Sequence, residues 1–195
     1  MTSRRMLLVI LVLATSACIQ LQGLPPASRY FLLEPMSDVD KIHVESTLAI
    51  NIEVVDFPDY LRRPQVVVQQ QDNILHFSDS QRWATALEEN IAAVLRNNVE
   101  QMIPAATVLI GPWHGSQANE NMVQLSVRKF TGILGQHSHV DIRWRVIFVA
   151  GNELSGTFTH RHAIDDSYEE LIRALNLALA KLSKELVTVL LETGA

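Results

Sequence analysis

The sequence from residue 139 to residue 149 reads His-Val-Asp-Ile-Arg-Trp-Arg-Val-Ile-Phe-Val, and every second side chain from Val140 to Phe148 is apolar. Successive side chains of a strand point to opposite faces of a sheet, so this alternation predicts a strand with one buried face. The other face is polar, and we expect it to meet water or a protein partner. Its residues are His139, Asp141, Arg143 and Arg145.

The segments on both sides of this stretch extend the sheet. Residues 122–131 form the first arm of a predicted hairpin, joined to residues 139–149 across Gly132-Ile133-Leu134-Gly135. A turn at Gly151-Asn152 then precedes a strand over residues 157–164. Shorter strands are predicted earlier in the chain, over residues 29–33, 48–55, 65–71 and 107–110.

Two helices complete the predicted fold. The first begins at Ser78 with a Ser-x-x-Gln capping pattern, continues with apolar residues at helical spacing from Trp83 to Met102, and stops before Pro104. The second begins with Ser167-x-x-Glu170 and runs to about Leu191. Its apolar face is wider than a heptad seam, which favours packing on the sheet over a coiled coil. We therefore expect an α/β fold, a single domain in which helices pack on one mixed sheet as an α/β sandwich.

The first residues indicate export and lipid attachment. Arg4 and Arg5 precede about nine apolar residues, too few to span a bilayer as a permanent helix but typical of a signal peptide. Thr15-Ser16-Ala17-Cys18 then resembles a bacterial lipobox, although leucine is usual where Thr15 stands. The prediction is a signal peptide over residues 1–17, cleaved between Ala17 and Cys18, with fatty acid (palmitate) on Cys18. Because Cys18 is the only cysteine, the chain forms no internal disulfide.

Residues 18–27 read as a lipidated N-terminus and tether, and residues 28–195 as the domain. Lipid chains on Cys18 would hold the protein on a membrane without spanning it, and the tether would allow the domain to stand about 30 Å away. Aspartate after the cysteine is the familiar signal for retention at the inner membrane. Ile19 stands there instead, so the lipoprotein resemblance implies a periplasm-facing protein of the outer membrane.

The charge balance disfavours nucleic acid as a partner. Loss of residues 1–17 removes Arg4 and Arg5, which leaves 14 basic against 21 acidic residues. Nucleic-acid binding needs a basic surface, and the only local cluster is small. It consists of Arg128, Lys129, Arg143 and Arg145.

The sequence predicts neither a catalytic centre nor a cofactor or metal site. Trp113-His114-Gly115-Ser116 lacks the elbow of a serine nucleophile. Two His-x-His pairs, His137/His139 and His160/His162, have a spacing that metals use, but they lack further ligands in register. If the following hairpin turns symmetrically about Gly151-Asn152-Glu153, His160 and His162 lie opposite Arg145 and Arg143, which disfavours a four-histidine site.

One further segment carries a family pattern. It reads Pro58-Asp59-Tyr60-Leu61-Arg62-Arg63-Pro64 between two predicted strands, and Trp83-Ala84-Thr85-Ala86-Leu87 follows downstream. This order of elements resembles that of the ABC-type transport auxiliary lipoproteins, the PqiC-like family. Their pattern is a strand, a P-x-Y-L-x-R-P connection, a second strand and a helix that starts with W-A-x-x-L. The resemblance implies a non-enzymatic outer-membrane subunit of an MCE-type intermembrane lipid transport system. Its partners would be an MCE-domain protein that spans the periplasm and an inner-membrane permease-type protein, and the resemblance also implies a homo-oligomer, since family members can assemble as rings.

Alternatives remain open for these residues. The two prolines restrict the segment 58–64 and predict that Tyr60 and Leu61 are held in a short turn. Tyr60 and Leu61 could simply cover the sheet edge while Arg62 or Arg63 caps carbonyls, or the segment could contact a partner. Trp83 could be a core anchor that shares a helix face with Leu87, or a binding hot spot. A free-standing lipoprotein that binds an apolar ligand or stabilises the envelope is the alternative function.

Overall fold

The alternating stretch forms the centre of β7 (His137–Ile147), which lies between β6 (Asn121–Ile133) and β8 (Glu153–Ala163) in a five-stranded sheet. β7 runs antiparallel to both β6 and β8, as the predicted hairpins require. The apolar face of β7 is buried, which confirms the predicted alternation.

The chain is represented by a computed structural model that describes residues 27–193 except 38, 45–46, 71–72 and 113–118. The predicted signal peptide and Cys18 lie outside the described residues.

The other half of this large sheet is parallel. β2 (Leu48–Asp56) pairs with β6 on one side and with β5 (Ala106–Ile110) on the other, both in parallel register. The strand order is β5-β2-β6-β7-β8, so β5 and β8 are the edges. The sheet is mixed, as the sequence predicts.

The remaining strands form a second, smaller sheet rather than joining the first. Its order is β1 (Arg29–Phe31), β4 (Leu75–Trp83) and β3 (Gln65–Gln69), with β1 parallel and β3 antiparallel to β4. The short 3-10 helix η2 (Asp59–Leu61) lies in the connection between β2 and β3. The predicted α/β class is therefore correct, but the expectation of one sheet is wrong.

The predicted start of the first helix is also wrong. Residues 75–83 form β4, and α2 (Leu87–Met102) begins nine residues after Ser78. The hydroxyl of Ser78 does accept a hydrogen bond from the Gln81 amide at 3.0 Å, but inside a strand. The helix stops before Pro104, as predicted.

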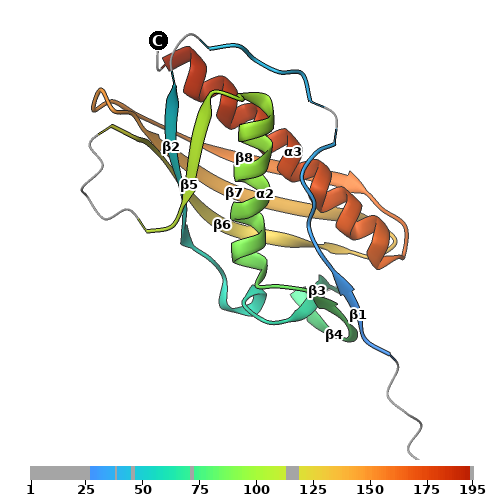
Figure 1. The fold of residues 1–195 in the computed structure, drawn as a ribbon. Helices are drawn as coiled ribbons and strands as arrows, with labels where there is room; N and C mark the ends of the chain where they lie inside the picture. Colours follow the sequence, from blue (N-terminus) through green and yellow to red (C-terminus); the bar gives the residue numbers. More distant parts are fainter. Residues whose placement is uncertain (1–26, 38, 45–46, 71–72, 113–118, 194–195) are drawn as a thin grey trace, which may run out of the picture.

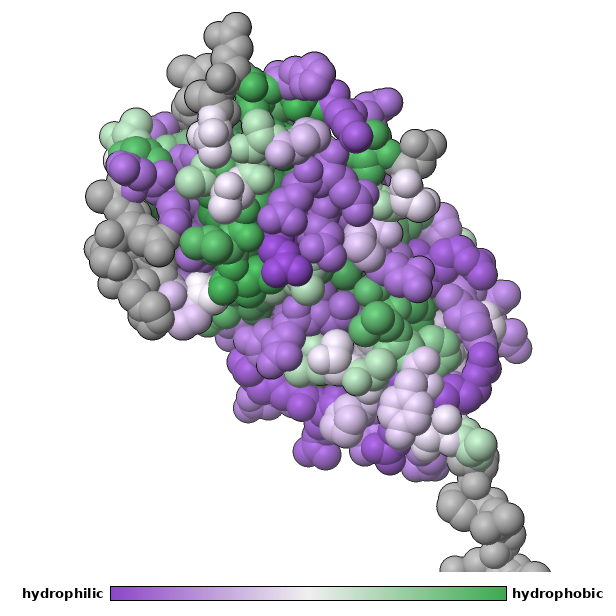
Figure 2. Space-filling view, viewed as in Figure 1, coloured by the Kyte–Doolittle hydropathy of each residue, from purple (hydrophilic) through white to green (hydrophobic). Residues whose placement is uncertain are grey.

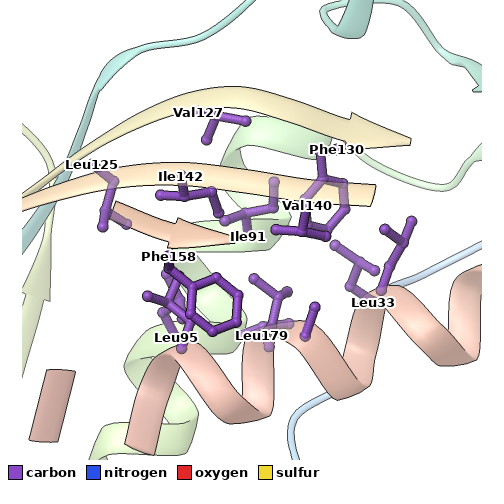
Figure 3. Packing of buried hydrophobic residues seen from close by; sticks show 14 of the residues in the cluster. Leu33, Ile91, Leu95, Leu125, Val127, Phe130, Val140, Ile142, Phe158 and Leu179 are labelled. Atoms are coloured by element: carbon purple, nitrogen blue, oxygen red, sulfur yellow. The ribbon is translucent and has the colours of Figure 1, made fainter. Parts of the chain in front are cut away.

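The second helix, α3 (Tyr168–Thr193), has the predicted cap. The Glu170 amide donates to the Ser167 hydroxyl at 3.2 Å, one bond of the Ser-x-x-Glu pattern. Both helices cover the same face of the large sheet (Figure 1), and α3 packs on β6, β7 and β8 as its wide apolar face predicts. One continuous core results, and Figure 3 shows Ile91, Leu179, Phe130 and Ile142 meeting between the layers. No helix among the described residues is long and apolar enough to cross a membrane.

The chain that follows β1 is fixed against both helices, and we call residues 32–37 the strap. The Asn90 side chain accepts from the Leu33 amide at 2.8 Å and donates to the Leu33 carbonyl at 3.2 Å. Asn98 of α2 accepts from the Met36 amide at 2.9 Å, and Asn176 of α3 accepts from the Glu34 amide at 3.2 Å. Extended backbone away from a sheet must find such partners for its amides, and three asparagines supply them here.

Candidate docking surfaces

The segment 58–64 adopts the short turn that its prolines predict. Pro58 is extended, and the Leu61 amide donates to the Pro58 carbonyl at 2.9 Å. Leu61 is 2% exposed, whereas Tyr60 is half-buried against the core, and this burial raises the pKa of the Tyr60 hydroxyl. The tyrosine thus has one side packed and one side open, as a contact residue in a rigid loop would.

The two arginines of this segment contact carboxylates and aromatic rings; capping of carbonyls was one of the two alternatives for them. Arg62 forms an ion pair with Glu88 in the first turn of α2 and lies 3.7 Å from Asp59. Its guanidinium also sits 5.5 Å from the centre of the Phe57 ring. Arg63 sits 5.2 Å from the Phe77 ring. Arg62 therefore joins the segment to the start of α2.

A groove opens beside Arg62. It has a volume of about 580 Å³, and its apolar side chains include Ile52, Leu87 and Ile110. Glu88 and Glu89 line it as well, so charge of both signs meets its apolar residues. Figure 2 shows apolar side chains gathered over β2 and β5, next to the polar surface of α2. The acidic pair in the first turn of α2 is the signal for this groove that the sequence analysis missed, because the helix start was misplaced.

The predicted polar face of β7 lies on the side of the large sheet that the helices leave uncovered. Arg143 is exposed between Ser126 of β6 and Thr157 of β8, and Arg145 is exposed and paired with Glu153. Arg145 stands opposite Gln124 and Ser155. We call this surface of β6, β7 and β8 the outer face.

The structure does not bring the two predicted contact regions together. The segment 58–64 reaches the start of α2, which packs on the helix-covered face of the sheet, while Arg143 and Arg145 point from the opposite face. A partner that docks in the groove beside Arg62 therefore leaves the outer face free.

Trp83 is a core residue. Its side chain is 5% exposed and belongs to the same buried cluster as Leu87. It lies in β4 rather than in a helix, and its amide donates to the Pro64 carbonyl at 2.7 Å. The Trp83 backbone thereby holds the C-terminal end of the segment 58–64 in place.

The histidine pairs lie on opposite faces of the large sheet. His139 stands opposite Arg161 on the outer face, whereas His160 stands opposite the buried Val140. The sequence predicted that His160 and His162 lie opposite Arg145 and Arg143, and this predicted register of β8 against β7 was wrong. Partial burial, followed by the charges of Arg161 and Lys129, lowers the pKa of His139. Burial, followed by Lys181 and His162, lowers the pKa of His160.

Metal removal is expected to leave stability unchanged. The described residues include no group of three or more His, Cys, Asp and Glu side chains that could hold an ion. A structural metal contributes its binding energy to folding, so its loss lowers the melting temperature. Thermal melts with and without a chelator are expected to coincide, and a drop that zinc reverses would contradict this prediction. Residues 113–116, the other segment weighed for chemistry, lie outside the described part of the chain.

The comparisons with known proteins agree with the fold. A crystal structure of an uncharacterized protein superimposes with a TM-score of 0.70 at 19% identity, covering 84% of this chain and 99% of its own. A DUF330 protein from Xanthomonas campestris gives a TM-score of 0.66 at 15% identity, covering 85% and 96%. The PelC dodecamer from Paraburkholderia phytofirmans gives 0.42 at 15% identity, covering 73% and 90%. No curated protein matches the chain.

The first two of these structures share the fold of this chain, an α/β domain with two helices on mixed sheets. Residues 30–187 match the family described as the ABC-type transport auxiliary lipoprotein component, and the chain belongs to this family. It is thus a lipoprotein of the cell envelope that serves an ABC-type transport system.

Proposed function

We propose that the chain is the non-enzymatic outer-membrane subunit of an MCE-type intermembrane lipid transport system. Cys18 carries the lipid anchor, and the domain faces the periplasm, where it docks with the MCE-domain protein that spans it. The inner-membrane permease-type protein belongs to the same system. Subunits of this chain assemble as a homo-oligomer. Membership of an auxiliary lipoprotein family supports the transport role.

The groove beside Arg62 is the observation that carries the docking role. It combines apolar side chains with charges of both signs, and its residue Arg62 belongs to the rigid loop that also carries the half-buried Tyr60. Protein interfaces join these features, with aromatic and arginine residues at their centre. The helices and the large sheet share one continuous buried core, and the groove opens at the surface. This arrangement favours a docking subunit over a protein that encloses an apolar ligand.

Tyr60→Ala combined with Arg62→Glu is expected to weaken assembly or MCE-protein binding by at least about tenfold while unfolding stays cooperative. The variant removes an aromatic contact and reverses a charge at the rim of the groove. It also breaks the Arg62–Glu88 pair, so we expect a stability loss of about 1–2 kcal/mol, most of it from Tyr60 packing. Sedimentation of the non-lipidated domain, alone and with the MCE protein, measures association, and thermal melts measure folding.

Tyr30→Ala combined with Lys184→Glu is the matched control. It likewise removes one tyrosine ring and reverses one positive charge, but at exposed positions, since Tyr30 is 66% exposed and Lys184 lies on the exposed side of α3. Association of the control should equal that of the parent. Unchanged association in a well-folded Tyr60→Ala, Arg62→Glu protein would reduce the segment to a structural connection.

A further inference from the structure

The outer face concentrates positive charge in a chain that is acidic elsewhere. β6, β7 and β8 carry five cations and two carboxylates. From Cys18 onward, the rest of the chain has 9 basic and 19 acidic residues. The five cations are Arg128, Lys129, Arg143, Arg145 and Arg161, and the two carboxylates are Asp141 and Glu153.

A β-bulge produces part of this concentration. The register of β6 against β7 shifts between Val127 and Lys129, so Arg128 and Lys129 are both exposed beside Asp141. Lys129 stands opposite Asp141, and the Arg128 guanidinium lies 3.8 Å from its carboxylate. One carboxylate thus faces two cations. Bulges re-aim side chains in this way.

Much of this charge is not neutralised locally. Within the part of the chain that the structure describes, Lys129, Arg143 and Arg161 make no ion pair. His139 lies among them, and burial, followed by the positive charges of Arg161 and Lys129, lowers its pKa. The outer face therefore offers free cations to an anionic surface.

The side chains between the cations suit lipid head groups better than a protein. In register with Arg143 and its neighbours stand Ser126, Thr157 and Thr159, which are small hydroxyl donors. The outward positions of the three strands hold no Trp, Tyr or Phe, the residues that anchor protein interfaces. Cations with hydroxyl groups match a layer of phosphates.

The lipid anchor places a membrane within reach of this face. Cys18 lies nine residues before Ala27, the first described residue, which spans at most about 30 Å. The small sheet that contains β1 borders the outer face, because the Thr131 hydroxyl donates to the Val67 carbonyl at 2.8 Å and Thr131 stands opposite His139. A tethered surface acts at high effective concentration, so even weak affinity orients the domain.

We propose that the outer face docks on the anionic phospholipid surface to which the chain is anchored. This docking turns the helix-covered side, with the groove beside Arg62, away from the membrane. The inference rests on the charge of this face and on the lipoprotein family, and it does not depend on the identity of the protein partner.

Co-sedimentation with vesicles tests the proposal. The non-lipidated chain from Cys18 onward keeps every described contact, and its partition onto vesicles of equimolar phosphatidylcholine and phosphatidylglycerol is expected to exceed that onto phosphatidylcholine alone by about tenfold or more. Salt that shortens the Debye length to about 3 Å is expected to abolish the difference. Arg143→Glu combined with Arg161→Glu is expected to abolish it too.

Lys181→Glu combined with Lys184→Glu is the matched control, because it changes the net charge equally on exposed residues of α3. This control should retain most of the preference for anionic vesicles, and thermal melts should show both variants folded. Equal binding to both kinds of vesicle, or equal loss in both variants, would overturn the proposal. Loss of MCE binding in the Arg62 variant with normal vesicle binding would leave it standing.

Discussion

Gly156→Val is expected to lower the free energy of unfolding by about 3 kcal/mol, which corresponds to about 6–12 °C in melting temperature. Gly156 stands opposite Trp144 across β7 and β8. A Cβ atom at this glycine would lie 2.4 Å from Cζ2 and 2.6 Å from Cε2 of the indole. The ring cannot yield freely, because its Nε1 donates to the Glu185 carboxylate of α3 at 2.7 Å. Displacing the indole therefore separates α3 from the sheet.

Thermal and denaturant unfolding measure this effect. Thr157→Val, at the next position of β8 but on the outer face, is the control and should change stability by no more than about 0.5 kcal/mol. In a Trp144→Phe background the cost of Gly156→Val should shrink, because the smaller ring vacates the space. Equal melting of Gly156→Val and the parent would show that the sheet relaxes around the new side chain.

Cys18→Ser is expected to abolish fatty-acid attachment completely, because serine has no sulfur to form the thioether. Metabolic labelling with a fatty-acid probe in a bacterial host measures this directly, and fractionation should show loss of membrane association. Ser16→Ala, which keeps a small residue before the cleavage site, should retain the label. Equal labelling of the Cys18→Ser protein and its parent would contradict lipid attachment at Cys18.

The antiparallel strands of the large sheet were predictable because their signals are local. Alternation along residues 139–149 and turn residues at Gly151 indicate the strands and their antiparallel order, though not their register, without knowledge of the rest of the chain. The capping pattern at Ser167 likewise located the start of α3. These elements depend on neighbours in sequence, so one sequence suffices.

The small sheet was not predictable for the converse reason. β4 forms a local hairpin with β3, but its pairing with β1 joins segments that are far apart in sequence, and its last residue binds the Pro64 carbonyl. Ser78 and Gln81 mimic a helix start, whereas the true N-cap, Ala86, has no side chain that can cap. The candidate groove depends on this helix start, so Arg62 was predicted as a contact residue without its partner Glu88.

The register of β8 against β7 was the second feature that the sequence did not predict correctly. The expected hairpin placed His160 opposite Arg145, whereas Arg145 stands opposite Ser155, a shift of five residues. An odd shift moves every side chain of a strand to the other face, so Arg161 rather than His160 joins the outer face. The turn spans Phe148 to Asn152, where the Phe148 amide donates to the Asn152 carbonyl at 2.9 Å, and alternation alone does not specify its length.

The strap determines how a mechanical load from the membrane would enter the domain. Tension on a lipid-anchored N-terminus reaches β1 first, and this strand pairs with β4 over only three residues. Behind it, Asn90, Asn98 and Asn176 grip the backbone at Leu33, Met36 and Glu34. If tension separates β1 from β4, these hydrogen bonds still hold the strap, and the force passes to both α2 and α3. None of these three hydrogen-bonded points lies in the large sheet, so tension from the anchor loads the helices before it reaches the strands that form the outer face.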